Sequence, residues 1–120
     1  MLTIGMPVFN DKDYISGAIN SILSQSYRDF VLIISDDCST DGSAEICKSY
    51  ATKDERIIYI RQGANLGISR NMKFLLNQAR TRYFMWAAND DLWDKSFIST
   101  LIAALENNLN AVSAMSPVRF

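Results

Sequence analysis

The chain has 120 residues, of which 48% are hydrophobic and 21% charged, and this length and composition are typical of one globular domain. It carries 12 lysine and arginine residues against 13 aspartate and glutamate residues, so the formal net charge is −1 and the basic surface typical of nucleic-acid binding is missing. No histidine occurs, which excludes Ser-His-Asp and Cys-His catalysis and histidine-ligated metal sites. A bound metal would therefore need oxygen ligands.

Hydrophobic periodicity predicts strands and helices that alternate along the chain. Short apolar or β-branched runs predict strands, and apolar residues at three- and four-residue spacing predict helices. In chain order we expect strand 2–8, helix 13–26, strand 30–34, helix 43–52, strand 56–60, helix 67–79, strand 83–88, helix 95–107 and strand 111–118. This alternation over short loops favours an α/β fold, with a mainly parallel sheet flanked by helices on both faces. Within strand 83–88, we expect Phe84, Met85 and Trp86 to lie in the core.

The cysteines and the apolar runs indicate the cellular environment of the chain. Cys38 and Cys47 form neither a CxxC motif nor a disulfide framework, so we expect a loop residue and a core residue in a reducing, cytoplasmic environment. No apolar run approaches the roughly 20 residues that a membrane span needs. The N-terminus lacks the basic start and the cleavage site of a signal peptide. We therefore expect no direct membrane insertion of this chain.

Aspartate makes up ten of the 13 acidic residues, and six of these ten fall in two short clusters. The clusters are Asp36, Asp37 and Asp41, and then Asp90, Asp91 and Asp94. Both clusters, like Asn10, follow predicted strands, and ligands of an open parallel sheet bind beyond the carboxyl ends of its strands. Carboxylates in loops are also what hard cations such as Mg²⁺ and Mn²⁺ select.

A structural interpretation of these clusters is also open. Asp41 is placed to act as the N-cap of helix 43–52, and Asp94 and Asn89 are alternative caps of the last helix. A cap needs only one carboxylate, whereas two adjacent carboxylates repel each other. Capping alone therefore does not explain the two aspartate pairs.

A turn at 65–71 opens the third predicted helix. Its backbone N–H groups and Arg70 are placed to meet a phosphate or the edge of a base. The alternative is a solvent-exposed Arg70 on the face of that helix.

Five motifs follow one another along nearly the whole chain. They are Met6-Pro7-Val8-Phe9-Asn10, the segment 22–27, the segment from Asp36-Asp37 to Ser43, Asn65-Leu66-Gly67 with Arg70-Asn71, and Asn89-Asp90-Asp91. In order and spacing this set resembles the N-terminal half of a family-2 glycosyltransferase with the GT-A fold. The resemblance implies that the sheet is the Rossmann-like nucleotide-binding half of that fold.

The resemblance also implies a role for each matched residue. Asp37 matches the aspartate that hydrogen-bonds the uracil ring of a nucleotide sugar, and Pro7 and Phe9 match the loop around the nucleoside. Asp91 matches the last carboxylate of a DxD-type motif, which would bind Mn²⁺ or Mg²⁺ at the diphosphate and so contribute to catalysis. The full set of expected nucleotide-binding residues is Pro7, Val8, Phe9, Asn10, Asp36, Asp37, Arg70 and Asp90.

The implied activity is inverting transfer of a sugar from a nucleotide-activated donor, most simply a UDP-sugar. The implied acceptor is a glycan or lipid-linked molecule of cell-surface polysaccharide synthesis, and the implied location is the cytoplasm or the cytoplasmic face of the membrane. Two positions depart from the pattern, because Cys38 replaces the usual glycine and Asn89 replaces the first acid of a strict DxD.

Length is a further departure from the family pattern. Catalytic domains of the family are longer than this chain, so we expect residues 1–120 to be the N-terminal part of such a domain. On this expectation, the acceptor site and the catalytic base lie outside the chain.

Two other interpretations remain open from the sequence. The chain is either a non-catalytic fragment that binds nucleotide or forms a homodimer, or a receiver-like signalling domain. A receiver domain needs its acidic pair after the first strand and a lysine at the end of the fifth, where this chain has Asn10 and Ser116-Pro117.

Overall fold

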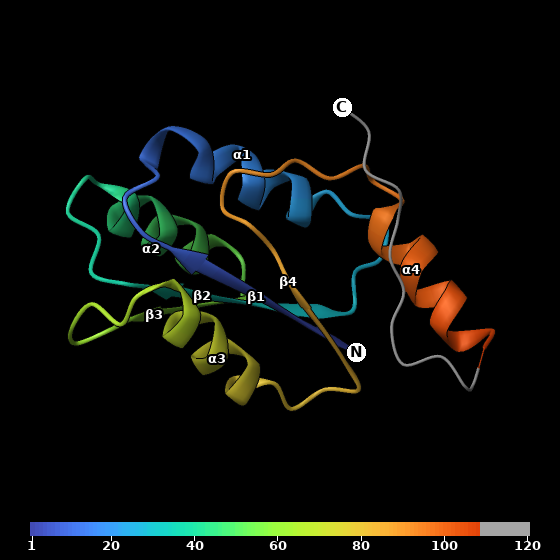
Figure 1. Ribbon diagram of the computed structural model, residues 1–120. Coiled ribbons are helices and arrows are strands. Elements are labelled where there is room, and N and C mark those ends of the chain that lie inside the picture. The colour runs from blue at the N-terminus through green and yellow to red at the C-terminus, as the bar shows by residue number, and fades with distance from the viewer. Residues whose placement is uncertain (109–120) are drawn as a thin grey trace.

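A computed structural model describes residues 1–108 of the chain (Figure 1). Within them, four parallel strands form one sheet in the spatial order β3-β2-β1-β4. The strands are β1 (Leu2–Val8), β2 (Phe30–Asp36), β3 (Ile57–Arg61) and β4 (Tyr83–Trp86), and the helices are α1 (Lys12–Leu23), α2 (Ser43–Lys53), α3 (Ile68–Gln78) and α4 (Phe97–Glu106). The predicted α/β class with a parallel sheet is confirmed. The strand expected at 111–118 lies outside the described residues.

The core forms around the two central strands, β1 and β2, because both consist almost entirely of buried residues. Helices α1 and α2 lie on one side of the sheet and α3 on the other (Figure 1). The apolar stripe of α1, made of Ile15, Ala18, Ile19 and Ile22, is at most 1% exposed and belongs to the main core cluster. The sheet is thus covered on both faces, as continuous apolar strands require.

Gly5 allows α3 to approach β1 closely. A Cβ atom at this position would lie 3.0 Å from Leu75 Cβ on α3 and 3.0 Å from Phe84 Cζ on β4. Because any side chain would fill this space, glycine sets the distance between α3 and the sheet.

Helix α1 ends at Leu23, before the predicted end near residue 26. The Gln25 N–H bonds to the Ile22 carbonyl oxygen over a single tight turn, at 3.1 Å. The buried Gln25 side chain donates to the Asp94 carbonyl oxygen at 2.6 Å and accepts the Ile98 N–H at 3.0 Å. These bonds tie the end of α1 to the start of α4.

The expectation that Trp86 lies in the core is wrong. Its side chain is 43% exposed, and its indole N–H donates to the Met72 carbonyl oxygen at 3.2 Å. Phe84 and Met85 are half-buried. The reason is that β4 is the edge strand of the sheet formed by residues 1–108, so its side chains have fewer neighbours than those of β1.

Candidate functional site

A cleft of about 410 Å³ opens at the carboxyl edge of the sheet. On one side of it β1 and β2 end together, with Val8 paired to Asp36. On the other side the chain after β4 runs beside β1, where the Ala87 N–H donates to the Gly5 carbonyl oxygen. The residues that line it are Pro7, Val8, Phe9, Asp11, Asp37, Asn65, Gly67, Ile68, Asn71, Ala88 and Asn89. The structure therefore brings four predicted nucleotide-binding residues into one cleft: Pro7, Val8, Phe9 and Asp37.

Asp37 lies between the cleft and the start of α3. Its backbone N–H donates to the Val8 carbonyl oxygen, and only 3% of the residue is exposed. Its carboxylate accepts the N–H of Leu66 at 2.6 Å and the N–H of Gly67 at 2.9 Å. A carboxylate has about four acceptor positions, so two remain for a ligand.

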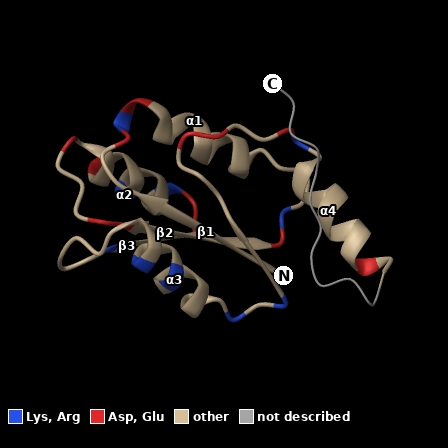
Figure 2. Cartoon of the chain, viewed as in Figure 1, with Lys and Arg blue, Asp and Glu red and all other residues tan. Residues whose placement is uncertain are grey.

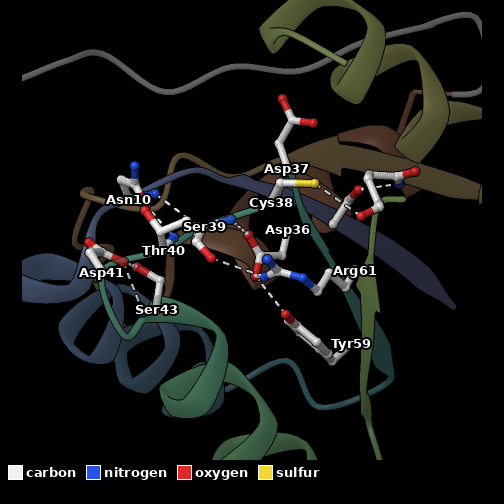
Figure 3. Close-up of polar contacts among 12 residues, drawn as sticks. Asn10, Asp36, Asp37, Cys38, Ser39, Thr40, Asp41, Ser43, Tyr59 and Arg61 are labelled. Atoms are coloured by element: carbon white, nitrogen blue, oxygen red, sulfur yellow. Dashed lines mark hydrogen bonds and ion pairs between the residues drawn. The ribbon is translucent and has the colours of Figure 1, made fainter. Parts of the chain in front are cut away.

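Asp36 points away from Asp37 into the interior (Figure 3). Its side chain is fully buried, and one carboxylate oxygen accepts the Tyr59 hydroxyl at 2.6 Å and pairs with Arg61 at 3.2 Å. The other oxygen accepts the Ser39 N–H at 2.9 Å. Burial, and then the bond to Asp36, raise the pKa of Tyr59. Asp36 does not line the cleft, and its contacts hold β2, β3 and the loop after β2 together.

Asn10 joins the loop after β1 to the loop after β2 (Figure 3). It has a φ of +50°, donates its N–H to Ser39 Oγ at 2.9 Å and accepts the Thr40 N–H at 2.8 Å through Oδ1. Asparagine tolerates this left-handed conformation better than most residues. The side chain thus shapes the rim of the cleft without lining it.

Asp41 binds the start of α2 in a different way from the prediction. The N-cap residue is Gly42, with a φ of +103°, and Asp41 Oδ1 accepts the N–H and the hydroxyl of Ser43 at 2.9 and 2.7 Å. Its second oxygen accepts the Lys12 N–H at 3.1 Å. The bond from the Ser43 hydroxyl is the main cause that lowers the pKa of Asp41. Asp94 makes the same pair of bonds to Ser96 before α4.

Acidic residues gather in the loop after β4 and around the start of α1 (Figure 2). Asp90 and Asp91 are exposed and do not line the cleft, although the adjacent Ala88 and Asn89 do. Burial raises the pKa of Asp11, and the nearby negative charge of Asp90 raises it further. The structure therefore brings Asp11, which the sequence analysis missed, towards the second aspartate cluster.

Arg70 is exposed on α3 and does not line the cleft. Its neighbour Asn71 does, and only 1% of Asn71 is exposed. The Asn71 amide donates to the Ser35 carbonyl oxygen at 3.0 Å, and its Oδ1 accepts the Ser35 hydroxyl. Asn71 thus fixes α3 against the end of β2.

Seven lining residues were not among the predicted site residues: Asp11, Asn65, Gly67, Ile68, Asn71, Ala88 and Asn89. Asn65, Gly67 and Asn71 belong to the motif at 65–71, and Asn89 belongs to the motif Asn89-Asp90-Asp91, so these motifs pointed to them. Asp11 directly follows Asn10, and its position after the end of a predicted strand could have indicated it as a site residue. Ile68 lies in the same turn, but an apolar residue at a helix start is usually buried in the core, so its exposure at the cleft was not predicted.

The described residues contain no ready-made metal centre. Among residues 1–108, no three cysteine, histidine or acidic side chains lie close enough together to hold a metal ion by themselves. The donors near the cleft are carboxylates, which suit a hard cation that also binds substrate phosphates.

A cleft beyond the carboxyl ends of parallel strands, with a carboxylate at a helix start, is typical of open α/β sheet proteins that bind a ligand at this edge. The family model described as Glycosyl transferase family 2 matches residues 3–120, and the chain belongs to this family. This confirms the resemblance and favours it over the receiver-like alternative.

Curated relatives support the same assignment. Glycosyltransferase GlyA of Streptococcus pneumoniae serotype 4 is 34% identical over 100 residues, which are 83% of this chain and 14% of GlyA. WfaP of Escherichia coli, a UDP-Glc:alpha-D-GlcNAc-diphosphoundecaprenol beta-1,3-glucosyltransferase, is 34% identical over 106 residues, which are 88% of this chain and 41% of WfaP. The chain thus spans less than half the length of either relative.

Solved structures show the same fold. S. aureus TarS in complex with UDP-GlcNAc superposes with a TM-score of 0.81 at 24% identity, over 88% of this chain and 31% of TarS. The mannosyltransferase PcManGT of Pyrobaculum calidifontis, in complex with GDP-Man and Mn²⁺, superposes with a TM-score of 0.80 at 18% identity, over 87% of this chain and 32% of PcManGT. The fold is that of the N-terminal part of GT-A structures.

Proposed function

We propose that the chain holds the donor nucleotide of a glycosyltransferase that uses a UDP-activated sugar. The observation that carries the proposal is the cleft itself, in which the Asp37 carboxylate lies beside the apolar side chains of Pro7, Val8 and Phe9. A nucleobase, which has flat apolar faces and N–H donors at its edge, fits a cleft that combines apolar side chains with a carboxylate. The UDP-Glc in the name of WfaP and the UDP-GlcNAc bound to TarS support a uridine nucleotide.

In this proposal each side chain has a distinct role. Asp37 accepts an N–H of the uracil ring with the acceptor positions that Leu66 and Gly67 leave free. Pro7 and Phe9 pack against the nucleoside. Asn10 and Asp36 act indirectly, because their side chains hold the loops that form the rim. Arg70 and Asp90 do not line the cleft, but each is exposed and adjacent in sequence to a lining residue, so we propose that they contact the part of the nucleotide that extends beyond the cleft.

The residues near the cleft fit a divalent cation that binds together with the nucleotide. Mg²⁺ is usually held by one or two carboxylates plus substrate phosphates, and Asp91 and Asp90 are exposed carboxylates beside the cleft-lining Asn89. Burial, and then the nearby charge of Asp90, raise the pKa of Asp11, and a cation bound beside Asp90 would reduce the second of these effects. When bound, Mn²⁺ or Mg²⁺ would stabilise the negative charge of the leaving diphosphate. The Mn²⁺ in the PcManGT complex supports this part of the proposal.

The remaining steps concern the acceptor. We propose inverting transfer to a glycan or lipid-linked acceptor of cell-surface polysaccharide synthesis, at the cytoplasmic face of the membrane. The diphosphoundecaprenol-linked acceptor in the name of WfaP supports the acceptor class. We assign acceptor binding and deprotonation of its hydroxyl to residues outside 1–120. Among residues 1–108, no helix is long and apolar enough to cross a membrane.

Thermal unfolding tests the proposal. A ligand that binds only the folded state at 100 times its Kd adds about 2.7 kcal/mol to stability. We expect UDP with Mn²⁺ to raise the melting temperature, and GDP with Mn²⁺ to raise it less. No shift with any nucleotide would contradict nucleotide binding by this chain.

Asp91→Asn tests the cation site in the same assay. This variant should lose most of the Mn²⁺-dependent part of the UDP shift. Asp29→Asn should keep it, because Asp29 is exposed just before the start of β2, at the opposite edge of the sheet from the cleft. An unchanged Mn²⁺ effect in Asp91→Asn would show that Asp91 does not hold the cation. Sedimentation velocity of the same samples distinguishes a monomer from the homodimer considered above.

A further inference from the structure

Two large apolar side chains stand exposed at the cleft. Phe9 is 51% exposed and Ile68 is 65% exposed, and both line the cleft at the carboxyl edge of the sheet. Six other large apolar side chains are exposed among the described residues: Met1, Tyr14, Ile58, Leu76, Trp86 and Leu92. None of these six lines the cleft. An apolar pair on the wall of a binding cleft gains free energy when a ligand removes it from water.

The backbone holds Ile68 in place through its neighbours. Gly67 has a φ of +84°, a conformation that favours glycine, and its N–H is bound by the Asp37 carboxylate. The Leu66 N–H is bound by the second oxygen of the same carboxylate. Ile68 is the first residue of α3, so a buried carboxylate and a helix, rather than a free loop, hold the backbone that carries its side chain.

We propose that Ile68 covers the nucleobase of the donor, as a second apolar surface in addition to that of Phe9. The inference rests on the proposed function and adds to it a residue that contributes to base binding. The base is the part of a nucleotide sugar with apolar faces, whereas the sugar and the diphosphate present polar and charged groups. Because Phe9 follows β1 and Ile68 begins α3, the two side chains approach the ligand from different elements.

Calorimetric titration of the chain with UDP and with uridine tests this inference. Ile68→Ala removes most of the apolar surface, so the Kd for both ligands should rise by about five- to tenfold. Ile68→Leu keeps that surface and should restore affinity to within about twofold of the original chain. Leu76→Ala is the matched control, because Leu76 is 45% exposed on the same helix but does not line the cleft.

The outcomes separate the inference from the proposed function. If the original chain binds UDP and uridine and Ile68→Ala binds both equally well, Ile68 does not cover the base. A loss confined to UDP would also overturn the inference, because uridine lacks the diphosphate but keeps the base. Absence of UDP binding by the original chain would overturn the proposed function itself, and the inference with it. Since Ile68 is mostly exposed, its truncation should leave folding intact, which far-UV circular dichroism checks.

Discussion

At the scale of single residues, two adjacent aspartates have opposite surroundings. Successive side chains at the end of a strand point to opposite sides. Asp36 therefore enters the interior, where it meets Tyr59 and Arg61, while Asp37 turns towards the cleft and the start of α3. Both carboxylates bond within the fold, but only Asp37 lines the cleft, although the sequence presents the two as an equivalent pair.

Asp36→Asn should lower the free energy of unfolding by about 2 kcal/mol, because it removes the charge from hydrogen bonds that involve Arg61 and Tyr59. Arg61 is 40% exposed, and solvent screening keeps the loss below that of a fully buried ion pair. Urea unfolding measures the change. Asp29→Asn is the control, because Asp29 pairs with the N-terminus at 68% exposure and should change stability little. Equal stability of the two variants would contradict this account.

Asp11 should titrate above the ordinary aspartate pKa of 3.8, because burial and then Asp90 raise its pKa. The unfolded chain releases this proton first, so ionisation of Asp11 weakens the folded state as pH rises from about 3.8 through the folded pKa. Asp90→Asn should lower the pKa of Asp11. An NMR titration of the carboxyl groups measures the pKa of Asp11 in the original chain and in the variant. An unchanged Asp11 pKa in Asp90→Asn would show that the two charges do not interact.

At the scale of elements, close approaches and loop contacts decide where the cleft lies. The loops after β1 and β2 are joined by bonds that include Asn10 to Ser39 and Asp11 to Ser43. Helix α3, on the face of the sheet opposite α1 and α2, packs against β1 at Gly5. This contact brings Gly67 and Ile68 to the cleft. The position of α3 thus sets one wall of the candidate site.

Gly5→Ala should destabilise the protein by about 1–3 kcal/mol, because overpacking at a tight contact forces neighbours to shift. The new Cβ would meet Leu75 Cβ at 3.0 Å, and an atom so close to the backbone of α3 cannot move alone. The displaced helix should also weaken UDP binding. Urea unfolding and UDP titration measure both effects.

Gly63→Ala is the control for that substitution, since nothing lies within 4 Å of a Cβ at this position. It should leave stability unchanged or raise it slightly. A Gly5→Ala variant as stable as Gly63→Ala would show that the contact with α3 is not tight.

At the scale of the whole molecule, the described chain folds around one core without a disulfide. Cys38 and Cys47 are both free thiols. Cys47 is 0% exposed and belongs to the main core cluster, whereas Cys38 is half-buried in a loop, with a φ of +66°. Cys38 should therefore react in the folded protein, whereas reaction of Cys47 should report global unfolding.

Iodoacetamide at pH 8 should modify Cys38 in the native protein but Cys47 only after global unfolding. Burial, and then the negative charge of Asp36, raise the pKa of the Cys47 thiol to about 12, so the reactive thiolate is scarce as well as inaccessible. Mass spectrometry of samples taken along a urea titration measures both sites. Modification of the two cysteines at the same rate in the absence of urea would contradict a buried Cys47.

The sequence by itself determined the order and type of the eight described elements, because apolar periodicity reflects which face of each element is buried. It also indicated the motifs that lie at the carboxyl edge of the sheet, since that edge follows from a parallel α/β topology. Element ends were less predictable: β2 extends to Asp36 because it pairs with Val8 of β1, a contact between distant parts of the chain.

Only the tertiary structure decided which polar residues share the cleft. Local sequence does not record whether a carboxylate meets Tyr59 and Arg61, as Asp36 does, or backbone N–H groups, as Asp37 does. Nor does it show that Ile68, at a helix start, stays exposed at the cleft while Leu75 of the same helix packs on Gly5. These outcomes depend on how α3 crosses the sheet, and side-chain contacts between residues far apart in sequence fix that geometry.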